Sequence, residues 1–434
     1  MMNRLSTPQG DSIALVAGLR TPFARRLTAL RGLDAVELGI RVTTELLACS
    51  AIDPAQVQRV VYGQVMGSPQ VSNIAREVVL GCGLDPRTDA YSVMRGCATS
   101  YQAVVAVIQA IQCGEIEVGL AGGADSSSAL PITVSPQLAD TVLAFNKART
   151  LKRRLAALRG LRLRHLIPNP PIIKDYTTGL TLSDSAEQLA KTYAISRETQ
   201  DQFTLRSHCL AAQAWRQGLL AEQVMPVYRL HKGRIFAQDN TLYSDRDIAQ
   251  LAELPPLCDP DYGTVTTGNS TVLADGAASV LLMSHQHAVS WGLEPLATIR
   301  SYAFTACNPF KSGLLGSLYA VPMALERAGL TLTDIDLIDV HEVSAAQVLA
   351  TLKCWASGCF TRETLGYDKP LGEVDMQRLN TQGGSLAYGH PFAATGARQL
   401  VQLAWQLRHL GGGLGLATAS TTGGLGAAIV LEVG

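Results

Sequence analysis

The stretch SAIDPAQVQRVV, residues 50–61, returns in altered form as AGLTLTDIDLID, residues 328–339, with apolar residues at matching places. Each copy reads as the end of a helix, then a turn, then an apolar strand. The same helix–turn–strand unit is therefore written in two distant parts of the chain.

Two further pairs of segments repeat in the same order. VGLA at residues 118–121 matches LGLA at residues 414–417, and GAASVL at residues 276–281 matches GAAIVL at residues 426–431. Three matches in one order indicate a duplication. Both halves then read strand–helix–strand–helix–strand–helix–strand–strand, with apolar strands that are typical of sheets covered on both faces. The sequence thus predicts an α/β fold built from two similar halves.

The repeat also predicts the domain organisation. We expect an N-terminal half formed by residues 1–125 plus 262–293, and a C-terminal half formed by residues 294–434. The long insertion between the two pieces of the N-terminal half, residues 126–261, lacks the repeat and is expected to form a loop domain. It contains a basic run, residues 147–164, without an acidic residue. This run is either a solvated helix face, a phosphate-binding edge for a nucleotide-tailed ligand, or a docking surface for a partner or a membrane.

Bulk composition excludes several classes of protein. The 434 residues carry 36 Lys and Arg against 36 Asp and Glu, so nothing in the overall charge favours nucleic acid or an anionic membrane. No apolar stretch approaches the roughly 18 residues of a membrane span, and the N-terminus has no apolar signal core. The nine cysteines form neither a disulfide framework nor a metal-site spacing. We therefore expect a cytoplasmic protein with no transmembrane segment and no metal.

Cys97 lies where a strand-like run, residues 90–94, turns into a helix-like run, residues 98–113. A thiol at the first turn of a helix faces unpaired backbone N–H groups and the positive end of the helix dipole, which favour the thiolate. The sequence therefore predicts a lowered pKa and a nucleophilic cysteine. The alternative is a small buried apolar side chain, which is the usual environment of a free cysteine.

Two histidines occupy positions that suit a ligand site. His390 lies in a run of small residues, GGSLAYGHPFAATGA at 383–397, where glycines let the backbone approach a ligand. His341 ends a strand, and ligands of α/β sheets bind at the carboxyl ends of strands. Either ring could act as a base or an oxyanion donor near neutral pH. Taken alone, His390 could equally be a core histidine with satisfied hydrogen bonds.

Together, four of these motifs resemble the thiolase family: RGCATS at 95–100, HE at 341–342, GHP at 389–391 and the glycine-rich C-terminus. Within that family the chain is most similar to the bacterial 3-ketoacyl-CoA thiolases of fatty-acid β-oxidation, which form the β component of a multienzyme complex. The resemblance extends over nearly the whole chain. Its supporting segments are GLRTPFA at 18–24, GGADSSS at 122–128, GTVTTGNST at 263–271 and DGAA at 275–278.

The resemblance implies a thiolase fold, a duplicated five-layered αβαβα arrangement that acts on acyl-CoA thioesters. Cys97 would take the acyl group, and His390 would assist its deprotonation and, with His341, polarise a substrate oxygen. A second oxyanion pocket would use the backbone N–H groups of Cys97 and Thr422. Thr271 would lie near the pantetheine arm of the substrate; alternatively it is a turn residue. The family also implies coenzyme A thioesters as substrates without a bound cofactor, a homodimer and, for members of a multienzyme complex, a hydratase/dehydrogenase α-type subunit.

The chain departs from the family pattern at two positions. LATASTTGG at residues 416–424 places Ser420 where thiolases have a second cysteine, an acid and base toward the α-carbon or the incoming thiol. A serine hydroxyl is a far weaker acid than a thiol, whose ordinary pKa is about 8.5, so Ser420 is a poor replacement. Beside His341, Ser344 stands where the family has a bulky phenylalanine, which predicts a changed substrate pocket.

Three functions therefore stay open. The first is a thiolase-like acyltransferase that performs 3-ketoacyl-CoA thiolysis or a Claisen-type condensation through an acyl-enzyme on Cys97. The second is a repurposed enzyme with a Cys-His-His site, which would perform ketosynthase-like condensation, acyl transfer to another nucleophile, or hydrolysis. The third is a non-catalytic thiolase-like subunit. A dinucleotide-binding dehydrogenase is disfavoured, because no Gly-x-Gly-x-x-Gly follows the first strand.

Overall fold

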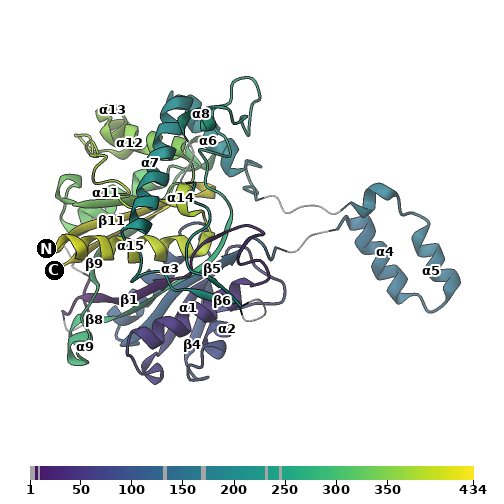
Figure 1. Ribbon diagram of the computed structural model, residues 1–434, viewed down its shortest axis with the longest axis horizontal. Helices are drawn as coiled ribbons and strands as arrows, with labels where there is room; N and C mark the ends of the chain where they lie inside the picture. Colours follow the sequence, from purple (N-terminus) through teal and green to yellow (C-terminus); the bar gives the residue numbers. More distant parts are fainter. Residues whose placement is uncertain (1–4, 8–9, 131–133, 168–172, 230–232, 244–246) are drawn as a thin grey trace. The chain divides into compact units, whose positions relative to one another are not determined.

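The computed structural model describes residues 5–7, 10–130, 134–167, 173–229, 233–243 and 247–434 (Figure 1). The chain forms two compact units, one of residues 1–129 and 175–434 and a small one of residues 130–174. The large unit contains both copies of the repeat and every residue expected in the site.

The first copy of the repeat begins with a buried strand and alternates strands with helices. Its elements are β1 (Ile13–Arg20), β2 (Ala24–Arg25), α1 (Ala35–Cys49), a 3-10 turn (Pro54–Gln56), β3 (Arg59–Gly63), α2 (Ile74–Gly81), β4 (Asp89–Val93), α3 (Thr99–Gln112), β5 (Val118–Ser126), β8 (Ala274–Ser284) and α9 (His285–Ser290). Asp34 and Glu37 form a capping box that starts α1. Leu38, Val42 and Leu46 recur at helical spacing and give this helix its buried face.

The second copy repeats this order. Its elements are β9 (Ala297–Ala306), α10 (Pro309–Ser312), α11 (Ser317–Ala328), a 3-10 turn (Leu332–Asp334), β10 (Leu337–Val340), α12 (Ala345–Ala356), α13 (Gly358–Phe360), a π-helical turn (Thr361–Leu365), α14 (Ser385–Tyr388), a 3-10 turn (Phe392–Ala394), α15 (Thr395–Leu410), β11 (Gly413–Thr421), a 3-10 turn (Thr422–Gly424) and β12 (Leu425–Val433). The counterpart of β4 is reduced to one parallel bridge between Ile338 and Leu379. The predicted duplication is therefore confirmed, apart from this one strand.

Strand pairing has the same pattern in both halves. The strands run in the order β10-β11-β12-β9-β1-β8-β5-β3-β4, and β2 pairs with β8 off this path. In the first half β3 is parallel to β5, which is antiparallel to β8, which is antiparallel to β1. β10, β11, β12 and β9 repeat those three relations. Strands β1 and β9 join the halves through an antiparallel pairing at residues 13–15 and 297–299.

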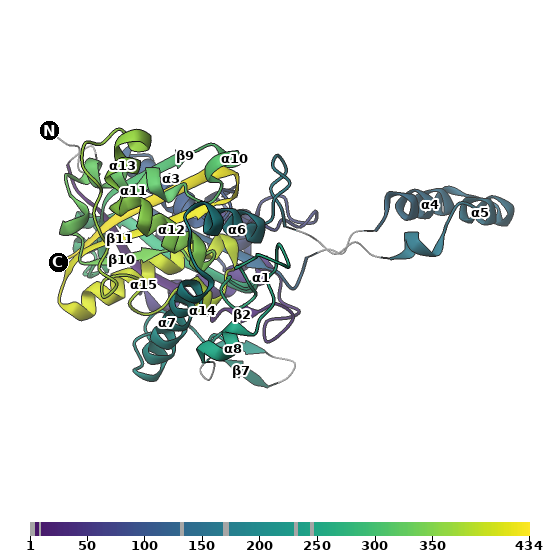
Figure 2. The same cartoon turned by 90° about the horizontal axis from the view of Figure 1, so that it is seen from above.

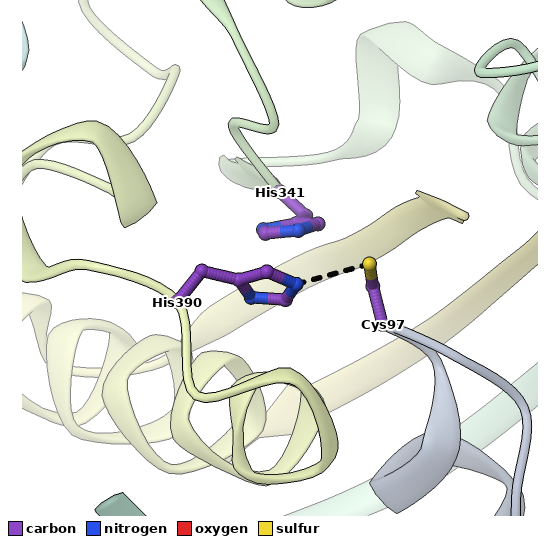
Figure 3. A group of neighbouring side chains, drawn as sticks. All are labelled: Cys97, His341 and His390. Carbon is purple, nitrogen blue, oxygen red and sulfur yellow. Dashed lines mark hydrogen bonds between the residues drawn. The ribbon is translucent and has the colours of Figure 1, made fainter. Parts of the chain in front are cut away.

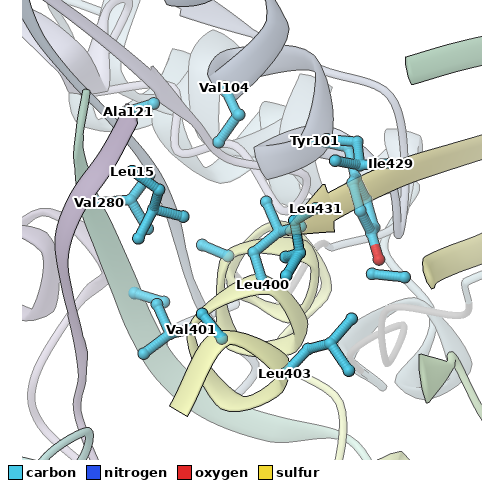
Figure 4. Close-up of a cluster of buried hydrophobic side chains, with 14 of the residues drawn as sticks. Leu15, Tyr101, Val104, Ala121, Val280, Leu400, Val401, Leu403, Ile429 and Leu431 are labelled. Carbon is cyan, nitrogen blue, oxygen red and sulfur yellow. The ribbon is translucent and has the colours of Figure 1, made fainter. Parts of the chain in front are cut away.

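Three apolar clusters separate five layers. One lies between α1, α2 and the first half of the sheet, and another lies between the second half and helices α11 and α12, which Figure 2 shows beside β10 and β11. The third surrounds the central helices α3 and α15. In this cluster Leu400 and Val401 of α15 pack with Val104 of α3, Leu15 of β1 and Val280 of β8 (Figure 4). This is the predicted five-layered αβαβα fold.

The predicted loop domain, residues 126–261, is divided between the two units. In the large unit it supplies α6 (Leu182–Thr192), α7 (Arg197–Arg216), β6 (Val227–Arg229), β7 (Arg234–Phe236) and α8 (Ile248–Ala252). In the small unit it supplies α4 (Pro136–Lys147), α5 (Leu151–Leu158) and a 3-10 turn (Leu163–Leu166). The basic run 147–164 lies in the small unit, mostly on exposed positions. The boundaries of the three domains stay a prediction.

Among the residues that the structure describes, no helix combines the length and the apolar character needed to cross a membrane.

Candidate active site

Cys97 lies in the turn between β4 and the first residue of α3, as the strand-to-helix pattern predicted. Gly96 before it has a φ of +53°, a left-handed conformation that glycine adopts without a steric cost. The turn carries the thiol inward, so that only 2% of Cys97 is exposed.

The structure brings Cys97 together with both predicted histidines (Figure 3). The Nε2 atom of His390 lies 3.0 Å from the Sγ atom of Cys97. The ring of His341 lies over that of His390, with the two centroids 4.3 Å apart and the planes inclined by 39°. Both histidines are fully buried. Cys97 and His390 are thus hydrogen-bonded although 293 positions separate them in the sequence. His341 joins them through its ring contact with His390.

His390 is oriented by the turn that precedes α15. Its Nδ1 atom lies 2.7 Å from the hydroxyl of Thr395, while Gly389 before it has a φ of +80°. Because Nε2 faces a thiol, which can donate a proton, Nδ1 is the ring atom that donates to Thr395. In this tautomer Nε2 can accept the proton of Cys97.

His341 is oriented from the opposite side by three buried polar residues. The Nη2 atom of Arg398 donates to the Ser385 hydroxyl at 3.2 Å, and that hydroxyl lies 2.8 Å from Nδ1 of His341. Asp339 in turn holds Arg398 through a salt bridge of 3.0 Å. Since Arg398 can only donate, the proton of Ser385 is free to donate to Nδ1, which leaves the proton of His341 on Nε2. That buried Nε2 has no hydrogen-bond partner among the described residues.

The acidity of Cys97 differs from the prediction. A lowered pKa was expected at the start of α3, but burial raises the pKa of the thiol to about 12. Burial also lowers the pKa of His390 to about 3, and burial together with His390 and Arg398 lowers that of His341 well below its ordinary value. The helix-end argument failed because it ignored desolvation, which opposes charge on all three groups. At rest the site therefore holds a neutral thiol beside neutral imidazoles.

Ser420 lies near the end of β11, where its hydroxyl is held by the start of α11. Its Oγ atom accepts the backbone N–H of Ser317 at 3.0 Å and lies 2.8 Å from the Ser317 hydroxyl. The next residue, Thr421, accepts the backbone N–H of Cys97 at 3.1 Å. That N–H was predicted as an oxyanion donor, but here Thr421 accepts it, and its role toward a substrate oxygen stays a prediction. Thr422, the other predicted backbone donor, begins the 3-10 turn after β11.

Thr271 and Ser344, the two predicted substrate-binding residues, have structural partners. The Thr271 hydroxyl donates to the carbonyl of Ser385, and its backbone N–H donates to Val343. Ser344 is the N-cap of α12 and accepts the N–H of Gln347 at 3.1 Å. Both residues border the turns that carry His341 and Ser385, and their roles toward a substrate stay predictions.

Sequence reasoning missed the residues that orient the three central groups. Ser385 and Thr395 lie inside the small-residue run 383–397, which marked the region but not the roles of its hydroxyls. Arg398 is a cation in the buried first part of α15, and this pattern could have indicated a buried ion pair. Thr421 carries no signal in the sequence, because only the fold brings it to Cys97.

The donor atoms of Cys97, His341 and His390 lie within 4.8 Å of one another, a set that could hold a metal ion. Sulfur and imidazole are zinc ligands. An ion bound there would take both the thiolate and the free Nε2 of His341, the groups that an acyl transfer needs. The absence of a metal, expected from the cysteine spacing, stays a prediction.

A buried cysteine with a histidine base and a second histidine donor, on a duplicated five-layered fold, defines an acyl-transfer site of the thiolase kind. Comparison with family models agrees: the N-terminal thiolase domain matches residues 13–286, and the C-terminal thiolase domain matches residues 293–433. The chain belongs to the thiolase family.

Curated relatives match it along almost its whole length. A protein named 3-ketoacyl-CoA thiolase from Yersinia enterocolitica is 53% identical over 429 residues, 99% of this chain and 98% of the relative. A protein of the same name from Pectobacterium atrosepticum is 54% identical over the same shares of both chains.

Solved structures show the same fold. The acetyl-CoA acetyltransferase of Bacillus anthracis matches with a TM-score of 0.83 at 30% identity, over 97% of this chain and 98% of its own. Human mitochondrial 3-ketoacyl-CoA thiolase in complex with CoA matches with a TM-score of 0.82 at 29% identity, over 98% of both chains.

Proposed function

We propose that this protein is an acyl-CoA acyltransferase that cleaves 3-ketoacyl-CoA, or forms it in the reverse direction, through an acyl-enzyme on Cys97. The observation that carries the proposal is the 3.0 Å contact between Cys97 Sγ and His390 Nε2, beside a second histidine whose Nε2 has no hydrogen-bond partner in the described part of the chain. The names of the relatives support the choice of substrate.

The first step follows from the neutral state of the site. As Sγ attacks the 3-keto carbon, His390 Nε2 takes the thiol proton, so no free thiolate has to form in the buried site before the attack. The bond between C2 and C3 then breaks, the acyl group stays on Sγ, and the electron pair leaves on C2 of acetyl-CoA. In the net balance C2 takes up the proton that left Cys97, so His390 returns to its neutral form. In the second step the thiol of coenzyme A attacks the acyl carbon, and its proton returns to Sγ of Cys97 as the thioester bond to the enzyme breaks.

His341 supplies the donor for the oxygen that gains charge. Its Nε2–H is held ready by Ser385 and Arg398 and costs no reorganisation when the oxyanion forms. A donor of this kind contributes on the order of 10²-fold to 10³-fold to the rate. His341 and His390 therefore have separate tasks: His390 moves the proton and His341 stabilises the oxygen.

Further properties follow from the same proposal. Coenzyme A thioesters are the substrates, without a covalently bound cofactor, and the enzyme is a homodimer that could bind an α-type hydratase/dehydrogenase subunit. We also propose a cytoplasmic location, which the nine free cysteines support, because thiols persist in a reducing compartment.

A second function is favoured by the state of Ser420. Its hydroxyl forms hydrogen bonds with Ser317. A hydroxyl is also a much weaker acid than a thiol, so we expect the protonation of C2 and the activation of coenzyme A to be slow. The protein would then be a repurposed acyltransferase with a Cys-His-His site, in which loss of CO₂ from a malonyl thioester generates the carbanion. Transfer of the acyl group to another nucleophile, or hydrolysis, would need the same acyl-enzyme.

Mass spectrometry of the intact protein with acyl-CoAs of several chain lengths, and with malonyl-CoA, tests the proposal. We expect an acyl adduct on Cys97 that is absent from Cys97→Ala. Rapid release of the adduct by free coenzyme A would support thiolysis, whereas a stable adduct that is released only with malonyl-CoA would support the repurposed enzyme. No adduct with any thioester, in protein shown to be folded, would overturn both functions and leave a non-catalytic subunit.

A further inference from the structure

Thr421 belongs to the second half of the fold, and its side chain contacts the backbone of Cys97, the predicted nucleophile of the first half. Thr421 is the last residue of β11, and 1% of it is exposed. Its Oγ1 atom accepts the backbone N–H of Cys97 at 3.1 Å, across 324 positions of sequence. A buried hydroxyl therefore lies directly against the turn that carries the thiol.

The turn is shaped to admit this hydroxyl. A Cβ atom placed on Gly96 would lie 2.0 Å from Oγ1 of Thr421, far inside van der Waals contact. Gly96 also has a φ of +53°, which disfavours any larger side chain. The space left by the missing side chain at position 96 is thus filled by the side chain of Thr421.

The hydroxyl proton of Thr421 is available for a hydrogen bond to Sγ of Cys97. A threonine hydroxyl accepts through its lone pairs and donates one proton. Oγ1 accepts the Cys97 amide, and the described residues offer the hydroxyl proton of Thr421 no other recorded acceptor, so we place that proton toward Sγ of the same residue. Burial raises the pKa of the Cys97 thiol, and the hydrogen bond from the Thr421 side chain is the largest effect that lowers it.

We propose that Thr421 is a positioning residue that holds the Cys97 turn by accepting the Cys97 amide N–H and that its hydroxyl donates a hydrogen bond to Sγ as the thiolate forms. The inference rests on the proposed function of Cys97 as the nucleophile. No proton is transferred from Thr421: the thiol proton goes to Nε2 of His390, and the hydroxyl stabilises the sulfur anion that remains. The hydroxyl thereby offsets part of the desolvation that disfavours the thiolate in this buried site.

Alkylation of Cys97 by iodoacetamide tests this role without any acyl-CoA. The rate is measured in the full-length protein between pH 7 and 10, and peptide mapping separates Cys97 from the exposed cysteines. Thr421→Val keeps the shape but removes the hydroxyl. We expect it to slow alkylation at pH 8 by about tenfold to a hundredfold and to move the rise of the alkylation rate toward higher pH. Thr421→Ser keeps the hydroxyl and should stay within about threefold of the original rate.

Controls separate this role from a structural one. Thr418→Val removes another buried hydroxyl from β11, one that donates to the carbonyl of Ala427, and should leave the alkylation profile of Cys97 unchanged. If Thr421→Val does not fold, Thr421→Ala removes the same hydroxyl and adds no volume. Equal alkylation in Thr421→Val and the original protein, or equal slowing in Thr421→Val and Thr421→Ser, would overturn the inference. Failure of the proposed function would look different: acyl-CoA would give no adduct although alkylation still depended on Thr421.

Discussion

At the scale of single residues, Cys97 and His390 share one proton in surroundings that disfavour charge on either. The helix end beside Cys97 favours a thiolate, yet burial outweighs it and raises the pKa of the thiol. A thiol that stays neutral until substrate arrives is protected from oxidation and alkylation, since the thiolate is the reactive form. Proton transfer must then accompany the attack on the substrate.

The pH dependence of acylation follows from this neutral pair. His390 accepts a proton only when it is unprotonated, and its pKa is lowered to about 3, so the base is fully available at pH 5.5 and above. We expect the rate of acyl-enzyme formation to change by less than about twofold between pH 6 and 8. Rapid-quench mass spectrometry measures this rate. A loss of half the rate near pH 6.5, the ordinary histidine value, would contradict the assignment.

Ser420→Cys should restore acid–base chemistry at the second position. A thiol can exchange a proton near neutral pH, and general acid–base catalysis is worth on the order of 10²-fold to 10⁴-fold. We therefore predict that coenzyme A releases the Cys97 adduct at least about tenfold faster in this variant. Ser420→Ala is the matched control and should not gain. Unchanged or slower release from Ser420→Cys would mean that position 420 does not serve the second step.

At the scale of elements, one buried ion pair connects three segments of the second half to the site. Asp339 on β10 holds Arg398 on α15, and Arg398 holds Ser385 on α14, which contacts His341. Two charges buried in this way are costly unless each satisfies the other. The pair therefore ties the helix, the strand and the turn into one arrangement that also sets the tautomer of His341.

Breaking this pair should affect both stability and chemistry. Arg398→Met leaves Asp339 as an unpaired buried charge, and we expect a loss of about 3–5 kcal/mol of unfolding free energy in urea titrations. Arg408→Met on the same helix removes the partly exposed partner of the exposed Glu294 and should cost no more than about 1 kcal/mol.

The double variant Asp339→Asn with Arg398→Met should recover part of the loss, because no unpaired charge remains. If Arg398→Met is no more destabilising than Arg408→Met, the pair does not hold these elements. Acylation by the folded Arg398→Met protein should also be slower, since Ser385 is then free to accept the proton of His341.

At the scale of the whole molecule, the duplication builds the site. Cys97 follows β4 of the first half, whereas His341 and His390 belong to the second half. The central helices α3 and α15 pack against each other and bring the two sets of turns together. A site that requires both halves forms only when the whole large unit has folded.

The buried histidines should make the folded state sensitive to acid. Their pKa values lie below those of unfolded histidine, so the unfolded state binds protons that the folded state does not once the pH falls below about 6.5. Their contribution to stability is complete above that pH and declines below it, by at most about 1.4 kcal/mol per pH unit for each ring. Buried Asp125, whose pKa is raised by burial to about 7, acts in the opposite direction.

Comparison of variants isolates the histidine effect. The free energy of unfolding of His390→Asn, relative to the original protein, should improve as the pH falls from 7 to 5, when measured by urea denaturation. His409→Asn removes an exposed histidine and is the control. A difference between His390→Asn and the original protein that stays constant over this range would contradict a depressed pKa.

How far prediction from sequence reached depends on the kind of signal. Strand and helix order followed from local apolar periodicity, and Cys97, His341 and His390 followed from their positions at strand ends and in a glycine-rich run. The exception in the fold is the counterpart of β4, which is only a bridge at Leu379. The residues that orient the site were not found, because Ser385, Thr395 and Thr421 act through contacts that no spacing in the sequence records.

The sequence by itself determined the duplicated α/β fold, the family and the three central residues, because these depend on local pattern and on motifs. Only the tertiary structure decided the acidity of Cys97, the tautomer of His341 and the contact with Thr421. The physical reason is that desolvation and hydrogen bonding are properties of the packed surroundings. For Cys97 those surroundings are supplied by both halves of the chain, and they reverse what the helix end alone would predict.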